Sequence, residues 1–304
     1  MPKVSVIIPV YNTAQYLEES ISSIVNQTLR DIEIIIVDDG SSDGSSDVIE
    51  KFANEDKRII FIKQKNYGQS VARNVAIDIA QGDYIYFMDS DDILNLDALF
   101  LCLDRCNKNN LDLLFFDGNI IYEEGAKEIS WDYNRSNYFN EDELYCGKSL
   151  IEKMLATYSF RAVPWLYLVK TDCFRKLNLR FLPNIIHEDE LFTFLLFLQS
   201  HKIGYLNKKL IFHRIRCNST MSKVFSLFNV DCYIEVLKEV QKFKKTNLTY
   251  SEVIDRYTYY VINAVCQTAK SLNYKDRIKF YLKCRSSNID KYLYKKNLFK
   301  LFIG

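Results

Sequence analysis

The chain has 304 residues, 48% of them hydrophobic and 26% charged, which is the composition of an ordinary globular protein. Its 40 basic and 39 acidic residues leave a net charge of +1 and exclude the strongly basic balance of a general nucleic-acid binder. The eight cysteines form no C-x-x-C pair, so the sequence predicts reduced thiols in a cytoplasmic protein rather than a zinc site. Met1-Pro2-Lys3 leads directly into strand-like sequence, and no apolar run approaches the ~18 to 20 residues of a membrane span, so we expect neither a signal peptide nor a membrane-spanning helix.

The first 90 residues alternate between apolar, β-branched runs and amphipathic helical patterns. This alternation predicts an α/β fold with a Rossmann-like, mostly parallel central sheet flanked by helices. No G-x-G-x-x-G or P-loop sequence follows any strand, which excludes a dinucleotide-binding fold and a P-loop NTPase. We expect strands at 4–10, 32–37, 59–63 and 82–88, and helices at 13–25, 47–54 and 71–81.

Four short segments lie at the ends of the four predicted strands, the edge where parallel sheets bind ligands. They lie at 9–11, 38–39, 66–70 and 89–91. Because the carboxyl ends of parallel strands share one edge of a sheet, we expect these residues to converge on one rim.

The fourth of these groups places three carboxylates within four residues, directly after an apolar run. If the strand continues to its end, alternation places Asp89 and Asp91 on one face and Ser90 and Asp92 on the other. Two carboxylates on one face suit Mg²⁺ or Mn²⁺, which prefer oxygen ligands. The alternative is an acidic turn in which Asp92 or Asn95 caps a helix.

The second half of the chain continues the mixed pattern and then changes character. An irregular, aromatic segment at 117–146 predicts a loop or strand insertion over the site, and from about residue 222 the pattern is helical to the end. We therefore expect a domain at 1–220, with a nucleotide-binding half (1–105) and an acceptor-binding half (106–220), followed by a helical region at 221–304. Between these landmarks we expect helices from 96, at 148–158 and at 191–198, and strands at 111–116, 163–169 and 210–216.

Four motifs in this order resemble family 2 glycosyltransferases with the GT-A fold. They are the runs at 4–12 and 36–43, Asn66 to Gly68 with Ala72-Arg73-Asn74, and Asp89 to Asp92; the resemblance covers roughly residues 1–220. It implies an inverting transfer of a sugar from a nucleotide donor, usually UDP-linked, to an acceptor hydroxyl. It also implies Mn²⁺ or Mg²⁺, which offsets the negative charge of the departing diphosphate.

The resemblance assigns donor-binding roles to residues on the predicted rim. Asp91 resembles the metal ligand, Asp89 a contact to ribose or metal, and Asp39 the acceptor of a pyrimidine N–H. Arg73 is a candidate for the base or the phosphates, and its alternative is a salt bridge on a helix surface. Pro9 and Tyr11 resemble the wall of the base pocket. The full set of expected donor contacts is Pro9, Val10, Tyr11, Asp39, Asn66, Gly68, Arg73, Asp89, Ser90 and Arg214.

An inverting transfer needs a general base, and Glu188-Asp189 before an apolar helix resembles the acidic pair of the family. In that pair the second acid, here Asp189, is the base. The alternative is that these acids only stabilise the first turn of the helix. Leu191 stands where H-E-x-x-H would place its second histidine, so His187 does not begin a zinc-protease motif.

Two further sets of residues are left with open roles. Arg214 or Arg216 would suit a diphosphate, because a guanidinium fork matches phosphate oxygens. His213 is either a metal ligand or a structural histidine. Trp131 is a candidate for stacking on an acceptor sugar, while Trp165 lies in a strand-like run and is expected in the core.

The last thirty residues interleave aromatic and basic side chains. This composition fits a peripheral helix on an anionic membrane, where a lipid-linked acceptor would be found, and equally a helical cap or an oligomer contact. The resemblance places the enzyme in assembly of a capsule, lipooligosaccharide or other surface polysaccharide, with a glycan or lipid-linked glycan as acceptor. The rival functions are a sugar nucleotidyltransferase, which would show a glycine-rich phosphate loop after the first strand, and a catalytically silent sugar-nucleotide-binding module.

Overall fold

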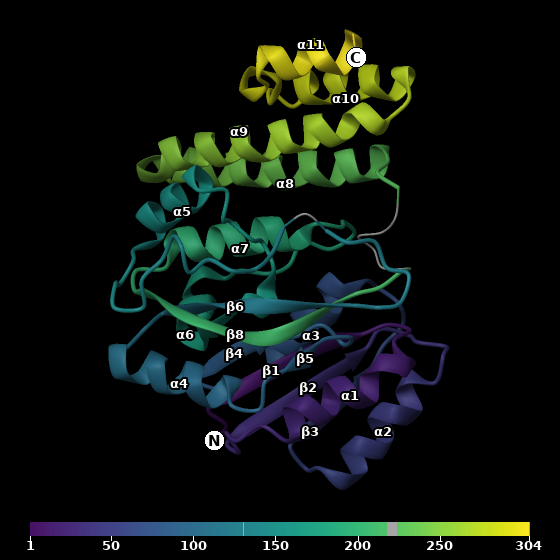
Figure 1. The fold of residues 1–304 in the computed structure, drawn as a ribbon, viewed down its shortest axis with the longest axis vertical. Helices are drawn as coiled ribbons and strands as arrows, with labels where there is room; N and C mark the ends of the chain where they lie inside the picture. Colours follow the sequence, from purple (N-terminus) through teal and green to yellow (C-terminus); the bar gives the residue numbers. More distant parts are fainter. Residues whose placement is uncertain (130, 218–223, 304) are drawn as a thin grey trace.

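The computed structural model describes residues 1–129, 131–217 and 224–303. A curled sheet of eight strands lies between helices, and further helices stack above one of its faces (Figure 1). The strand order is β3-β2-β1-β4-β7-β6-β8-β5. The strands are β1 Val4–Val10, β2 Ile32–Asp38, β3 Ile59–Lys63, β4 Tyr84–Phe87, β5 Ile93–Leu94, β6 Leu113–Tyr122, β7 Tyr167–Lys170 and β8 Ile203–Ile215.

The first half of the sheet is parallel, as predicted: β1 pairs with β2 and β4, and β2 pairs with β3. Alternate residues of β1 face opposite layers. Ile7 belongs to one buried cluster with α3 (Gln69–Ile79) and α7 (Glu188–Gln199). Val6 and Ile8 belong to the other cluster, with α1 (Ala14–Val25) and α4 (Ala98–Asn109). Helices on both faces explain why these strands are apolar throughout.

The second half of the sheet is mixed. β7 is antiparallel to both β4 and β6, and β5 is antiparallel to β8, while β6 and β8 are parallel. β6 continues to Tyr122, beyond the predicted end at Phe116, because its pairing with β8 shifts register at Phe116 and Asp117 and then resumes. The strand predicted at 163–169 begins instead as a 3₁₀ turn, Pro164–Leu166.

One prediction about the acidic segment is wrong. β4 ends at Phe87, and the N–H of Asp92 donates to the carbonyl of Asp89 at 3.2 Å, so the carboxylates lie in a turn. The alternating faces expected for Asp89 and Asp91 against Ser90 and Asp92 therefore do not exist. The short elements β5 and α6 (Thr171–Leu177) were not predicted.

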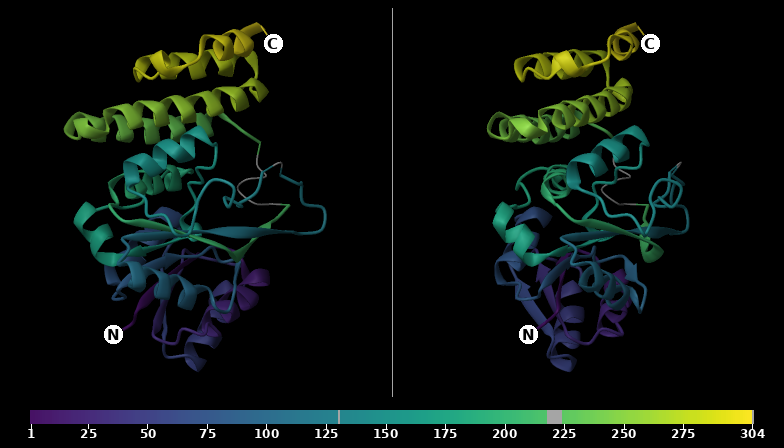
Figure 2. Two further views of the ribbon diagram at one scale, coloured as in Figure 1. Left: turned by 60° about the vertical axis from the view of Figure 1, so that its left-hand side comes forward. Right: turned by 90° about the vertical axis from the view of Figure 1, so that its left-hand side faces the viewer.

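The C-terminal helices stack outward from α5 (Gly147–Ala156) and α7, as the views in Figure 2 show. α8 and α9 lie side by side and contact α7 and α5, respectively. One buried cluster runs from the sheet through α7 into this stack. The predicted boundary at 220/221 and the serine-rich loop 218–222 lie outside the described residues. The stack consists of α8 Leu227–Thr246, α9 Ser251–Thr268, α10 Tyr274–Ser286 and α11 Lys295–Ile303. α2 (Ser45–Glu55) packs on α1, at the opposite end of the molecule (Figure 1).

None of the helices in the described ranges is both long and apolar enough to cross a membrane.

Candidate active site

Asp39 ties the end of β2 to the loop between β3 and α3. Its carboxylate accepts hydrogen bonds from the N–H groups of Tyr67 (2.9 Å) and Gly68 (2.8 Å) and from Nε2 of Gln64 (2.7 Å). Gly40 has φ +81°, and a Cβ there would lie 2.8 Å from the backbone nitrogen of Asn66, so this loop requires glycine. Two of the predicted rim groups are thus held together by one buried carboxylate.

The end of β1 forms the next part of the rim. Pro9 and Val10 are buried in the strand, and the carbonyl of Val10 accepts the N–H of Asp39 at 2.8 Å. Tyr11 and Tyr67 are 50% and 57% exposed, so two aromatic rings stand on loops that Asp39 connects. The sequence analysis did not name Tyr67 as a donor contact. Its position between Asn66 and Gly68, which were both named, could have indicated it.

Arg73 is the central contact of the site. Its side chain is only 3% exposed, so the alternative of a surface salt bridge is wrong. One nitrogen donates to Oε1 of Glu188 at 2.7 Å and the other to Oδ1 of Asp89 at 2.9 Å. Gln69 also donates to Oε1 of Glu188. Arg73 therefore joins α3, the acidic turn and the start of α7.

The start of α7 carries three acids in its first turn. Burial, together with the neighbouring Glu188 and Glu190, raises the pKa of Asp189 well above its ordinary value. Glu190 instead accepts the hydroxyl of Tyr257 at 2.7 Å. The N-cap residue is His187, with φ +67°, and burial lowers its pKa to about 4. Asp189 is thus a half-buried acid near Arg73 whose proton affinity is raised, and perturbed acids of this kind are candidates for acid–base chemistry.

The acidic turn separates into two partly buried carboxylates and one fully buried one. Burial raises the pKa of Asp91 to about 7, with Asp92 and Asp89 adding to the shift. Nε of Arg216 lies 2.7 Å from Oδ2 of Asp91. Asp92 has no exposed surface and accepts Nδ1 of His213 (3.0 Å) and the N–H of Arg214 (2.9 Å). Asp92 therefore anchors β8 to this turn through buried hydrogen bonds.

The remaining side chains near the turn are fixed by their neighbours. Ser90 accepts the hydroxyl of Thr13 at 2.9 Å. The ring of His213 stacks on Trp165, with 4.7 Å between centroids, and the charge of Asp92 raises the pKa of His213. Trp165 is buried in the core, as predicted. Arg214 donates to the carbonyl of Asp91 (3.0 Å) and to Glu19 (2.6 Å), so of the two candidate arginines it is Arg216 that reaches a carboxylate of the turn.

The donor set of the turn suits a hard divalent cation. Burial and the two neighbouring carboxylates both raise the pKa of Asp91, and a bound cation would offset both effects. Within the described ranges, no three His, Cys, Asp or Glu side chains are placed to hold an ion together. Mg²⁺ and Mn²⁺ need only one or two carboxylates when phosphate oxygens and waters complete the shell, so Asp89 and Asp91 fit such an ion.

A parallel half-sheet with an acidic turn at its carboxyl rim and a second acidic group on a facing helix defines the GT-A class of α/β proteins. The profile of the family described as Glycosyl transferase family 2 matches residues 5–164. The chain belongs to this family.

Individual relatives agree with this assignment. Glycosyltransferase GlyA of Streptococcus pneumoniae is 31% identical over 242 residues, which cover 78% of this chain and 34% of GlyA, so the chain matches only about a third of that relative. The structure of S. aureus TarS 1–349 in complex with UDP-GlcNAc superposes with a TM-score of 0.68 at 20% identity, covering 95% of this chain and 89% of that one. The mannosyltransferase PcManGT of Pyrobaculum calidifontis, in complex with GDP-Man and Mn²⁺, gives 0.53 at 14% identity, with 99% and 86% covered. At these identities the two structures show the shared fold.

Proposed function

We propose that this protein is an inverting, metal-dependent glycosyltransferase that moves a sugar from a nucleotide-sugar donor, UDP-linked, to a hydroxyl of a growing surface polysaccharide, capsule or lipooligosaccharide. The observation that carries the proposal is the bridge Glu188–Arg73–Asp89, because it joins the helix of the candidate base to the acidic turn on the donor rim. Without that bridge the two acidic groups would be separate features of the fold.

In the proposed reaction, an acceptor oxygen forms a bond to the anomeric carbon of the donor while the bond from that carbon to the diphosphate oxygen breaks. The electron pair of the broken bond leaves with the nucleoside diphosphate, and the acceptor proton passes to the carboxylate of Asp189. Attack opposite the leaving group inverts the anomeric carbon. Asp89 and Asp91 would hold Mn²⁺ or Mg²⁺, which supplies positive charge against the departing diphosphate.

The rim residues supply donor contacts in this proposal. Tyr11 and Tyr67 offer exposed rings for a base, and Asp39 holds both of their loops in place. Arg216 is the candidate for the diphosphate, because its guanidinium already faces Asp91. His213 holds the acidic turn through its hydrogen bond to Asp92. Its role as a metal ligand remains a prediction.

The C-terminal helices support a second part of the proposal, peripheral contact with an anionic membrane that carries the acceptor. Residues 271–304 hold nine basic and two acidic side chains, so this segment carries +7 and the rest of the chain −6. Tyr274, Ile278 and Leu282 lie one turn apart on α10 and are exposed, beside Lys275 and Lys279. The eight cysteines are free thiols, which supports the cytoplasmic face of that membrane.

The deciding experiment is a donor screen with the full chain. UDP-, GDP- and dTDP-sugars are incubated with and without Mn²⁺, and release of the nucleoside diphosphate is measured, with calorimetry of UDP under the same conditions. We expect Mn²⁺-dependent release from one UDP-sugar, lost in Asp91→Asn. Binding of UDP without any turnover of any donor would favour the silent binding module, and pyrophosphate release from a sugar phosphate and UTP would favour the nucleotidyltransferase.

A further inference from the structure

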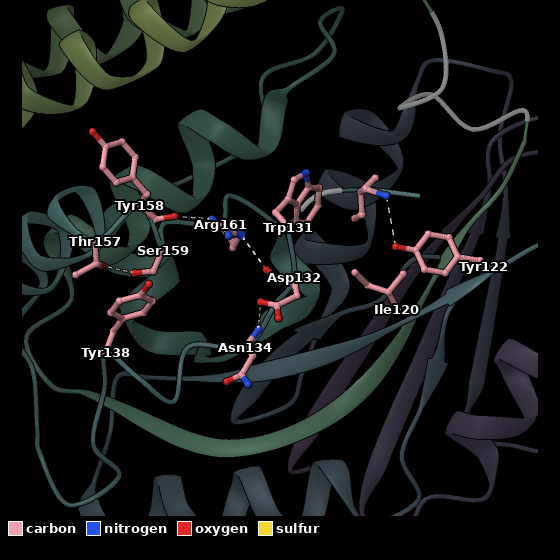
Figure 3. A pocket seen from close by; sticks show the side chains of 11 residues that line it. Ile120, Tyr122, Trp131, Asp132, Asn134, Tyr138, Thr157, Tyr158, Ser159 and Arg161 are labelled. Carbon is pink, nitrogen blue, oxygen red and sulfur yellow. Dashed lines mark hydrogen bonds between the residues drawn. The ribbon is translucent and has the colours of Figure 1, made fainter. Parts of the chain in front are cut away.

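A hollow of about 520 Å³ opens beside the end of β6 (Figure 3). Its walls come from three segments: the end of β6, the aromatic stretch that follows it, and the turn after α5. The residues that line it are Ile120, Tyr122, Ile129, Trp131, Asp132, Asn134, Tyr138, Thr157, Tyr158, Ser159 and Arg161.

Four of these residues expose aromatic rings, with exposed fractions between 37% for Trp131 and 73% for Tyr158. Large aromatic side chains normally gain free energy by burial, so four that remain open around one hollow indicate a surface for a ligand. Polar groups also line the hollow: Asn134 and Asp132 are exposed there, whereas Ser159 is buried and its hydroxyl bonds that of Thr157. A ligand with apolar faces and a rim of hydroxyl groups matches this lining.

Arg161 joins two walls of the hollow, and its positive charge is balanced by the carboxylate of Asp132. Its guanidinium donates to the carbonyls of Tyr158 (2.9 Å) and Asp132 (3.3 Å) and lies 5.5 Å from the ring centre of Trp131. These bonds join the segment after β6 to the turn after α5, so the rings are held in position before any ligand binds. With one arginine and one aspartate, the hollow does not favour a phosphate or a nucleotide, and it suits a neutral sugar.

A chain of edge-to-face aromatic contacts connects this hollow to the acidic turn. The ring of Trp131 lies 5.0 Å from that of Tyr133, which lies 4.7 Å from Trp165 and 5.8 Å from His213. His213 in turn bonds Asp92. The hollow and the reaction site are therefore parts of one packed unit.

We propose that this hollow is a subsite for a pyranose unit of the acceptor glycan, remote from the hydroxyl that receives the new sugar. The inference rests on the proposed function and adds to it the chemical class of the acceptor: a neutral saccharide of more than one unit, held by aromatic stacking. Trp131 is a specificity-determining residue in this reading and does not touch the reacting atoms.

The chain has two tryptophans, so Trp131 and the buried Trp165 give two indole N–H signals, which Trp131→Phe assigns. The full chain is titrated with the methyl glycosides of glucose, galactose, N-acetylglucosamine and rhamnose, and with UDP and Mn²⁺ as a separate ligand. We expect at least one glycoside to shift the Trp131 signal, both with and without UDP. In Tyr138→Ala the affinity for that glycoside should fall about five- to tenfold, while Phe100→Ala, which removes an exposed ring on α4, leaves it unchanged.

A Trp131 signal that no glycoside moves up to its solubility limit would overturn the subsite. Equal weakening in Tyr138→Ala and Phe100→Ala would also overturn it, because binding would then not involve the hollow. Donor hydrolysis without acceptor is measured on the same variants. We expect hydrolysis in the unmodified chain and an unchanged rate in Phe100→Ala. No hydrolysis in the unmodified chain would be a failure of the proposed function, which is distinct from a failure of the subsite.

Discussion

Arg73 and Glu188 form a buried ion pair at 2.7 Å although 115 residues separate them in the sequence. Replacing Arg73 by Met leaves the carboxylates of Glu188 and Asp89 without their shared cation. We expect the free energy of unfolding in urea to fall by about 3–5 kcal/mol, the usual cost of breaking a buried pair. Arg180→Met, which breaks the exposed pair with Asp78, should cost less than about 1 kcal/mol.

Arg73→Lys separates charge from geometry. A lysine keeps the positive charge and loses the fork that spans two acids, so this variant should fold and turn over donor slowly. Full turnover in Arg73→Lys would show that the bridge does not position the site.

Asp189→Asn tests the general base. The amide has nearly the same shape and cannot take a proton, so we expect turnover to fall by ~100- to 10,000-fold while calorimetry shows unchanged binding of UDP with Mn²⁺. Asp172→Asn provides the control, because Asp172 is an acid in the first turn of α6 and should matter only to its own helix. Near-normal turnover in Asp189→Asn would return this residue to the helix-stabilising role.

The pKa of Asp189 gives the expected pH dependence. The acid serves as a base only when ionised, and burial with Glu188 and Glu190 beside it raises its pKa above the ordinary value of about 3.9. Turnover should therefore rise with pH through a midpoint well above 3.9. The free energy of unfolding should change in the opposite direction, because the folded state favours the protonated acid. As pH rises from about 4 toward that midpoint, the wild-type chain should lose stability relative to Asp189→Asn. A stability difference that does not change with pH would contradict the shift.

The contrast between Asp39 and Arg73 shows what the sequence can predict. Asp39 lies in a local motif after a strand, and the parallel order of the first strands follows from βαβ alternation, so both the rim and the parallel half-sheet were predictable. Arg73 depends on Glu188, whose distance in space no local pattern encodes. The same limit applies to the register shift in β6, to the two residues of β5, and to the end of β4 before Asp89. Each of them involves contacts with β8, far along the chain, which local strand propensity does not encode.

His213→Phe separates stacking from hydrogen bonding. Phenylalanine preserves a ring over Trp165 and removes the donor to Asp92, whose buried carboxylate then keeps the N–H of Arg214. We expect a loss of about 3 kcal/mol in the free energy of unfolding. His201→Phe, at an exposed position, is the matched control. The bond to Asp92 uses Nδ1 of His213, so Nε2 is the nitrogen that could bind a metal. UDP binding that keeps its Mn²⁺ dependence in His213→Phe would make His213 a structural residue, and loss of that dependence would make it a metal ligand.

The outer face of α10 decides whether the C-terminal helices meet a membrane. Leu282 is 54% exposed there, between basic side chains, and burying a leucine in a bilayer interface contributes about 1.5–3 kcal/mol. Leu282→Glu should therefore weaken binding to phosphatidylserine-containing vesicles by at least tenfold, measured by co-sedimentation. Leu248→Glu changes a leucine that is more exposed than Leu282, 73% on the turn before α9, and should bind as the wild type does. Binding of the wild type should also fall at high salt, since about 1 kcal/mol per basic side chain comes from the anionic surface.

If both variants bind vesicles equally well, the basic and aromatic face of α10 serves another contact. A second copy of the chain, detected by a concentration-dependent mass, would be the first partner to test.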